Sequence, residues 1–134
     1  MRMMFAMAAG ALALSALAVS TAGATDAKPD AKARTNQCFW VRSVESFAAP
    51  DSRTVNVRVG VRDVYQFDML GPCNDVNWSD RIALVSRGGS DIICTGMDAD
   101  IVTRSVTGQQ RCAIRSMRKL TPDEIAALGK RAQP

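Results

Sequence analysis

Four cysteines in a chain without histidine are the feature that most constrains this 134-residue sequence. They lie 35, 21 and 18 residues apart, at Cys38, Cys73, Cys94 and Cys112. An even number of cysteines in a small exported domain is typical of disulfide bonds. The sequence therefore predicts two disulfides, each contributing about 3–4.5 kcal/mol by restricting the unfolded chain.

The pairing of these cysteines has three possibilities, and the sequence alone does not choose among them. We favour a nested arrangement, in which Cys38–Cys112 joins the first and last strands and Cys73–Cys94 lies inside. A zinc site made of four cysteines needs at least one closely spaced pair, and a redox-active pair needs C-x-x-C. Neither spacing occurs here, so both alternatives are disfavoured.

The first 24 residues have the organisation of an export signal. Arg2 is the only charged residue among them, and an apolar run rich in alanine and leucine covers residues 5–19. Ala-Gly-Ala at 22–24 supplies the small residues that a signal peptidase accepts, so we expect cleavage after Ala24. An uncleaved membrane anchor is the alternative, because the uncharged stretch is long enough to span a bilayer.

Residues 25–37 predict a disordered linker, since they include no large apolar residue and cannot bury enough surface to offset ordering. The first cysteine, Cys38, follows this polar segment and does not directly follow the apolar run, which argues against a lipoprotein. Removal of residues 1–24 lowers the formal net charge from +4 to +3. Charges of both signs are interspersed, as in an ordinary soluble domain, and do not call for a nucleic acid.

Alternation of apolar and polar residues predicts a β domain over residues 38–120. The clearest strands, 54–59 and 64–69, each place their large apolar residues on one face, and together they form a hairpin. A glycine-rich turn at 87–91 predicts a second hairpin between its two flanking segments. The remaining strands and the members of this second hairpin are expected at residues 39–47, 82–86, 92–95, 100–105 and 112–117.

Residues 121–134 change character and predict a C-terminal helix and tail. Thr121 and Glu124 form a capping box, and Pro122 occupies the first helical position. The expected helix, 122–128, has about two turns and would be marginal alone, so we expect it to pack on the sheet. The predicted fold is all-β, a small antiparallel sheet or partly closed barrel with this short helix.

No recognisable catalytic constellation occurs in the sequence. A serine or cysteine nucleophile would need a lysine or carboxylate as its base, and no lysine lies beside a promising serine. Nucleotide-binding glycine motifs are absent, and we expect no cofactor and no metal. Asp98 with Asp100, and Asp75 with Asp80, are candidate acid/base or calcium pairs, although turn-forming aspartates at strand starts are the simpler interpretation.

Residues 77–81 are the best candidate for a recognition patch. Trp78 is followed closely by Asp80 and Arg81, a combination that is common in binding surfaces. We nevertheless favour Trp78 as a lid over the core, and Trp40 as a core residue, because large aromatic side chains are mostly buried. Four arginines are expected to gather near the last two strands without interleaved aromatic residues, which disfavours a nucleic-acid surface: Arg104, Arg111, Arg115 and Arg118.

A series of short motifs marks residues 38–120: Cys38, Arg42-Ser43-Val44, Asp51-Ser52-Arg53-Thr54-Val55, Tyr65, Leu70-Gly71-Pro72-Cys73, Arg81-Ile82, Cys94, Asp98, Ile101-Val102 and Cys112. In this order and spacing they resemble a family of small exported bacterial proteins known only as a domain of unknown function, found mainly in proteobacteria. The resemblance implies an envelope location and a disulfide-stabilised β fold. It implies no activity, because the family has none assigned.

We therefore predict a periplasmic or secreted protein that acts as a non-catalytic binding or structural module of the envelope. We expect a monomer whose partner is a protein or envelope component, with no nucleic acid and no stable membrane insertion after cleavage. The alternative is an enzyme of unrecognised type that uses carboxylates near Asp80 or Asp98. A third possibility is a purely structural protein without a specific ligand.

Overall fold

A computed structural model describes residues 37–134, so the predicted export signal and nearly all of the predicted linker lie outside the described residues. The strands are β1 (Phe39–Trp40), β2 (Val44–Ala48), β3 (Thr54–Val59), β4 (Asp63–Met69), β5 (Ile82–Ser86), β6 (Ile92–Ile93), β7 (Ala99–Ser105) and β8 (Gly108–Lys119). The helical elements within these residues are three 3₁₀ turns and one α-helix: η1 (Val41–Ser43), η2 (Val76–Trp78), η3 (Gly96–Asp98) and α2 (Pro122–Ala127). No helix in this part of the chain is long and apolar enough to cross a membrane.

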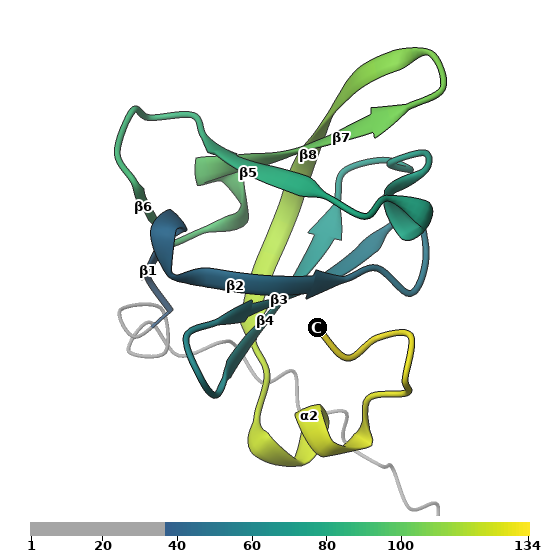
Figure 1. The fold of residues 1–134 in the computed structure, drawn as a ribbon. Coiled ribbons are helices and arrows are strands. Elements are labelled where there is room, and N and C mark those ends of the chain that lie inside the picture. Colours follow the sequence, from purple (N-terminus) through teal and green to yellow (C-terminus); the bar gives the residue numbers. More distant parts are fainter. Residues whose placement is uncertain (1–36) are drawn as a thin grey trace, which may run out of the picture.

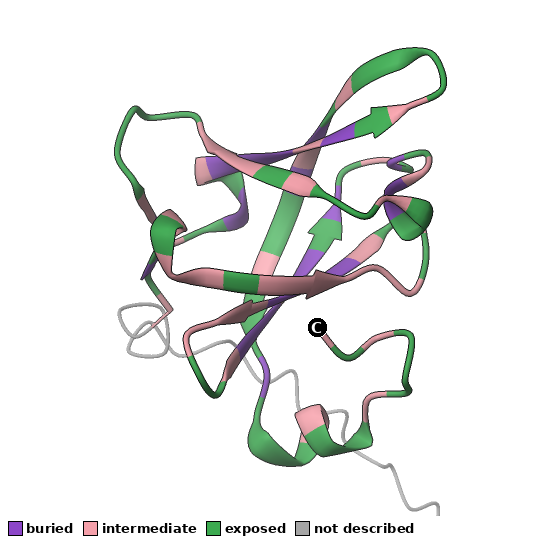
Figure 2. Cartoon of the chain, in the orientation of Figure 1, coloured by how far each residue is buried: buried purple, intermediate pink, exposed green. Residues whose placement is uncertain are grey.

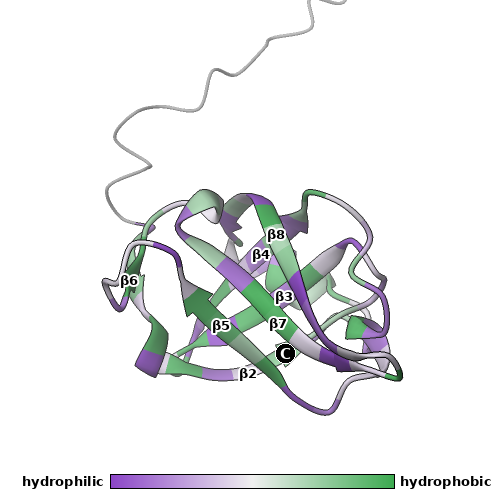
Figure 3. Cartoon of the chain, turned by 90° about the horizontal axis from the view of Figure 1, so that it is seen from above, coloured by the Kyte–Doolittle hydropathy of each residue, from purple (hydrophilic) through white to green (hydrophobic). Residues whose placement is uncertain are grey.

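Six of the strands form one antiparallel sheet in the order β2-β3-β4-β8-β7-β5. This sheet curls into a half-barrel, in which β5 and β7 lie above β2 and β3 (Figure 1). In the view from above, β5 and β2 project close to one another (Figure 3), although they are the two edge strands of the sheet. The prediction of an all-β fold with a partly closed barrel is therefore confirmed.

The long strand β8 joins the two halves of this sheet. Its first part pairs with β7 as far as Ala113, and its second part pairs with β4 from Ile114 onward. Within the second part the register shifts between Ile114 and Ser116, so Arg115 has no residue opposite it on β4. Such a bulge bends a strand and increases its local twist, which lets the sheet curl at this point.

The core lies inside the curl, where the buried residues of Figure 2 concentrate. The predicted hairpin of 54–59 and 64–69 is confirmed, because β3 and β4 pair over six residue pairs. The apolar side chains of these strands meet those of β7 and β8 in one buried cluster. Gly96 brings η3 close to β8, since a Cβ at this position would lie 2.8 Å from the backbone of Ser116.

Two strand predictions are wrong. The segments 82–86 and 92–95 do not form a hairpin, because β5 pairs with β7 whereas β6 pairs with β1. The disulfide Cys38–Cys94 holds the end of β6 beside β1, so the glycine-rich turn becomes a wide connection. The predicted strand 39–47 is also interrupted, because η1 separates β1 from β2.

The prediction of two disulfides is confirmed, but the favoured nested pairing is wrong. Cys38 bonds to Cys94, and Cys73 bonds to Cys112. The first pairing follows from β1 and β6, which place their neighbouring cysteines together. The second follows from the curl, which brings the buried Cys73 of the β4–β5 loop against the core side of β8.

The C-terminal helix and its capping box are confirmed. The Thr121 amide donates to Glu124 Oε2 at 2.8 Å, and the Glu124 amide donates to Thr121 Oγ1 at 3.3 Å. The helix ends at Ala127, one residue before the predicted end.

The tail packs on the sheet, whereas α2 has no buried residue and reaches the sheet through the Arg118–Glu124 ion pair. The side-chain amide of Asn56 on β3 donates to the carbonyl of Ala132 at 2.7 Å, and Arg58 donates to the backbone oxygen of Pro134. Asn56 alternates with the core valines of β3, so the tail covers the side of the sheet that faces away from the core. We call the outer side of β3, β4 and the second half of β8 the covered face.

Candidate recognition groove

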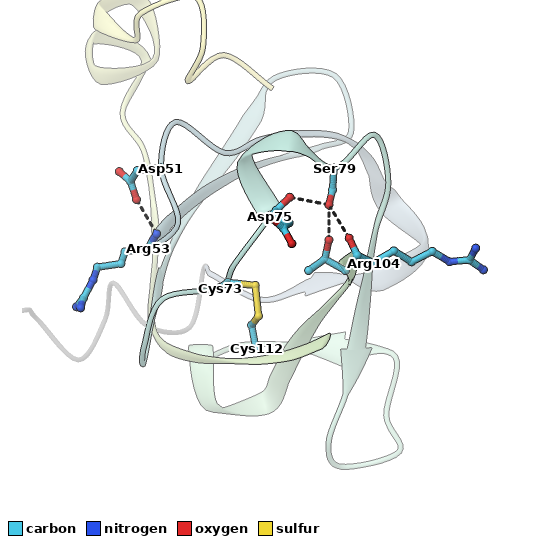
Figure 4. The surroundings of a disulfide bond; sticks show 8 residues. Asp51, Arg53, Cys73, Asp75, Ser79, Arg104 and Cys112 are labelled. Carbon is cyan, nitrogen blue, oxygen red and sulfur yellow. Dashed lines mark hydrogen bonds between the residues drawn. A yellow bond between two sulfur atoms is a disulfide. The ribbon is translucent and has the colours of Figure 1, made fainter. Parts of the chain in front are cut away.

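The predicted recognition patch lies on the loop between β4 and β5, which is tied firmly to the core. Cys73 is fully buried at its start and bonds to Cys112 on β8 (Figure 4). Val76 in η2 is also buried. Because a 3₁₀ helix has three residues per turn, an inward Val76 directs Trp78 to another side. Trp78 is 81% exposed, so its favoured interpretation as a lid over the core is wrong.

Ser79 fastens the far end of this loop to β7. Its hydroxyl donates to the backbone oxygen of Asp75 at 2.8 Å and contacts the hydroxyl of the buried Thr103 (Figure 4). It also lies 3.4 Å from the backbone oxygen of Arg104. Ser79 lies within the predicted patch of residues 77–81, but the sequence assigned no role to it or to Thr103, because nothing in a single serine or threonine shows that it will meet a distant partner.

A surface hollow of about 820 Å³ separates this loop from β5, β7 and the turn into β8. Its size lies within the range of small-ligand and peptide sites. We call it the larger hollow; six of its lining residues are Trp78, Asp80, Arg81, Val102, Arg104 and Val106. The structure thus brings the three predicted patch residues together on one wall of one hollow.

A smaller hollow of about 400 Å³ lies on the other side of the same loop, against the end of β2 and Arg131 of the tail. It shares Trp78, Ser79 and Asp80 with the larger hollow. The exposed indole therefore stands on a ridge between two depressions, where it is accessible from both.

The charged groups of the larger hollow are not used by the fold. Within residues 37–134, Asp80, Arg81 and Arg104 form no ion pair with another side chain. Asp75 lies in the same hollow and is also outside the ion pairs of this region. The hollow therefore offers two carboxylates and two guanidinium groups that remain able to bind a ligand.

Asp98 has a different use, because its carboxylate caps η3. Its Oδ2 accepts hydrogen bonds from the backbone amides of Cys94 at 3.0 Å and Thr95 at 2.7 Å. Partial burial acts to raise the pKa of Asp98, but these hydrogen bonds outweigh it and hold the pKa below its ordinary value. The carboxylate is thus kept ionised in a structural role at the start of β7.

Asp100 is buried on the outer side of β7 between two arginines. Arg87 donates from Nε and Nη2 to its Oδ1, and Arg111 Nε lies 3.0 Å from its Oδ2. The hydrogen bond from Arg87 lowers the pKa of Asp100, burial opposes this, and the charge of Arg111 lowers it further. Asp98 and Asp100 therefore do not face a common ligand, since each is committed to a different neighbour.

Three or more potential metal-ligating side chains do not gather anywhere in the described part of the chain.

The comparison with known families identifies the group to which the chain belongs. The model described as "Family of unknown function (DUF6491)" matches residues 1–133. The chain is a member of this family. No curated protein and no solved structure matches it. The resemblance to a domain of unknown function is thereby confirmed for this DUF6491 chain.

The arginines of this DUF6491 chain do not form the single cluster that the sequence suggested. Arg118 belongs to the covered face, where it bonds to Gln66. Arg115, at the bulge, donates to the backbone oxygen of Leu70. Only Arg104 and Arg111 lie near one another, on the strands β7 and β8.

Arg104 and Arg111 belong to a second outer surface, formed by β5, β7 and the first half of β8. We call it the bare face, because its side chains are exposed or half-exposed, apart from the buried Asp100. Its members are Ala83, Val85, Arg87, Asp100, Val102, Arg104, Gln109, Arg111 and Ala113. Trp40 lies outside both faces and is 44% exposed, with the guanidinium of Arg42 4.7 Å from its ring centroid, so its predicted place in the core is wrong.

Proposed function

We propose that this chain is an exported, non-catalytic binding module that recognises a protein or another envelope component through Trp78 and the larger hollow beside it. The observation that carries the proposal is the exposure of Trp78 on a loop that is otherwise anchored in the core. Tryptophan and arginine are the side chains that most often dominate binding energy at interfaces. Both occur here beside hollows that an incoming chain can fill.

The rigidity of the loop supports the same proposal. The disulfide Cys73–Cys112, the buried Val76 and the Ser79 hydroxyl hold the backbone on both sides of Trp78. A preorganised loop loses little conformational freedom when a partner binds, so more of the contact energy remains as affinity. An aromatic side chain without such a role would cost the protein solubility with no gain in stability.

Two disulfides within one small domain support a location outside the cytoplasm, where such bonds form and persist. The roles of Asp98 and Asp100 support a non-catalytic function over an enzyme built on these carboxylates. A general acid at neutral pH needs a raised pKa, whereas the neighbours of both groups lower it.

Substitution of Trp78 tests the proposal. Trp40 supplies the matched control, because it is a second exposed tryptophan and does not line the larger hollow. Wild type, Trp78→Ala and Trp40→Ala would be immobilised and exposed to periplasmic extract, and any retained species would be isolated and titrated. We expect retention by wild type and Trp40→Ala, and binding weakened by about 2 kcal/mol, roughly thirtyfold, in Trp78→Ala.

Equal affinity of all three proteins for the isolated species would contradict a recognition role for Trp78. Circular dichroism of the variants separates loss of binding from loss of folding. Because Trp78 is exposed, we expect its removal to leave the fold unchanged.

A further inference from the structure

The two edge strands of the half-barrel differ in how they are protected. β2 has a register shift between Val44 and Ser46, and Pro50 follows soon after its end. β5 pairs with β7 in five uninterrupted residue pairs and includes neither a bulge nor a proline. Bulges and prolines are the usual devices that prevent an edge strand from pairing with another chain. The β5 edge lacks both.

The outer edge of β5 carries no backbone hydrogen bond in the described residues, and η1 is the neighbouring element that comes close to β5. Within the described residues, the backbone hydrogen bonds of 82–86 run to β7, and none reaches another segment on the opposite side. None of the five residues is buried. The amides and carbonyls on this side are therefore unpaired groups of the kind that an added strand binds.

Two arginines bracket this edge on the bare face. Side chains of a strand alternate, so positions 81, 83, 85 and 87 share one side. Arg87 lies on that side because it binds Asp100, which is opposite Val85. Arg81 lies at the other end and lines the larger hollow. The edge thus presents a guanidinium, two small apolar residues and a second guanidinium in sequence.

The charges at its ends decide which partner suits this edge. Two copies pairing antiparallel through β5, centred on Leu84, would place Arg81 of each copy opposite Arg87 of the other. Like charges directly opposite one another destabilise a pair of strands, whereas opposite charges stabilise it. The edge is therefore protected against a second copy and suited to a strand with carboxylates at its ends.

We propose that β5 binds an extended segment of a partner protein, which adds to the sheet as a further strand. Acidic side chains six residues apart pair with Arg81 and Arg87, and small apolar residues between them lie beside Ala83 and Val85. Arg87 already binds one carboxylate, that of Asp100, through Nε and Nη2. Its Nη1 makes no hydrogen bond within residues 37–134, so it remains able to bind a second carboxylate supplied by the added strand.

This inference rests on the proposed function for its partner, since Arg81 belongs to both the edge and the larger hollow. It adds the chemistry of that partner, namely an extended backbone with a fixed spacing of acidic residues. Main-chain hydrogen bonds supply affinity in this mode of recognition, and the alternating side chains supply specificity.

A synthetic peptide tests the inference on the complete mature chain. The probe is the capped heptapeptide Glu-Thr-Val-Thr-Val-Thr-Glu, and its control replaces both glutamates with lysines. We expect the acidic peptide to slow amide hydrogen exchange in 82–86, with an affinity that falls as salt is added. The lysine peptide is expected to leave these amides unprotected.

A charge exchange gives the second arm of the test. Arg81→Glu is expected to weaken the acidic peptide roughly tenfold and to favour a mixed peptide with lysine at one end and glutamate at the other. Arg62→Glu, an exposed substitution in the β3–β4 turn, is the control and should change neither affinity. Unchanged amide exchange in β3 and β4 shows that each variant remains folded.

Failure of the acidic peptide to protect 82–86, or equal binding to Arg81→Glu, overturns the inference. Protection of 82–86 that grows with protein concentration alone shows that a second copy occupies the edge, and also overturns it. If the peptide fails while a species is still captured through Trp78, the proposed function stands without this inference. If the peptide binds but capture does not depend on Trp78, the proposed function fails instead.

Discussion

The covered face and the bare face of the same curled sheet use their polar side chains in opposite ways. On the covered face, Gln66 donates to Asn56 at 3.2 Å and accepts from Arg118 at 2.8 Å. Arg118 continues this chain to Glu124 of α2 at 2.6 Å, and Asn56 continues it to Ala132 of the tail. These polar groups hold the C-terminal segment against the sheet.

The bare face has only one such cluster, the buried Asp100 between Arg87 and Arg111. Beside it lie Arg81 and Arg104, which form no ion pair within residues 37–134, together with the outer edge of β5 and the larger hollow. The comparison teaches that polar residues on this fold are structural where they are satisfied internally. Where they are left unsatisfied on a rigid support, they are suited to a partner.

The largest expected effect concerns the disulfide that anchors the loop between β4 and β5. Cys73→Ala with Cys112→Ala should cost about 4 kcal/mol of unfolding free energy from chain entropy, and more from lost packing. Cys38→Ala with Cys94→Ala should cost less in total, because its longer loop (separation 56 against 39) adds only about 0.3 kcal/mol of chain entropy, whereas Cys73 and Cys112 are buried and Cys38 is exposed. Urea unfolding of the two double variants measures the difference. Equal losses would mean that the buried bridge adds no packing energy.

The second prediction compares the loss of one side-chain amide on each face. Asn56→Ala should cost about 1–3 kcal/mol, because it leaves the carbonyl of Ala132 and Nε2 of Gln66 without their hydrogen-bond partner. Gln109→Ala, at the exposed end of β8 in the larger hollow, should stay within about 0.5 kcal/mol of wild type.

Trypsin supplies an independent measure of the same difference, because the tail includes Lys130 and Arg131. Cleavage there should be faster in Asn56→Ala and unchanged in Gln109→Ala. If both variants resemble wild type in unfolding and in cleavage, the covered face is not held by its polar chain.

The smallest effect is expected in the pH dependence of stability. The Arg87 hydrogen bond holds the pKa of Asp100 below its ordinary value, so the folded state favours the ionised form. The resulting stability is fully present above the unfolded pKa, about 3.9, and is lost as pH falls through the lowered folded value. Asp100→Asn should therefore flatten the loss of stability below about pH 4.

Glu124 provides the matched carboxylate on the covered face. Hydrogen bonds from the Thr121 amide and from Arg118 lower its pKa as well, but the group is much more exposed than Asp100. Glu124→Gln should flatten the acid branch less than Asp100→Asn does. Urea unfolding between pH 3 and pH 6 measures both. A larger effect of Glu124→Gln would mean that the ion pair of Glu124 on the covered face stabilises the fold more than the ion pairs of Asp100 on the bare face.

Local signals predicted the parts of the fold that depend on neighbouring residues. The β3–β4 hairpin followed from two alternating segments close in sequence, and α2 followed from Thr121, Pro122 and Glu124 within a single turn. The β5–β6 hairpin was predicted from an equally clear turn signal and was wrong. A two-residue strand held by Cys38–Cys94 pairs with β1, and β5 gains a longer partner in β7.

The candidate site was predicted only in part. Trp78, Asp80 and Arg81 were recognised as a patch because they lie together in the chain, although Trp78 was favoured as a core residue. Its exposure depends on Val76, which takes the inward position of the 3₁₀ turn. The walls supplied by β7 and the free edge of β5 had no sequence signal, since both depend on where the sheet ends.

The sequence by itself determined the all-β class, the capped helix and the presence of two disulfides in this protein. These features depend on alternation, on spacing within one turn and on an even number of cysteines, all of which are local or countable. The tertiary structure decided which cysteines pair, which tryptophans are exposed and which strand edge remains open. Those features depend on which distant segments meet when the sheet curls, because burial and pairing are properties of neighbours in space and not of neighbours in the chain.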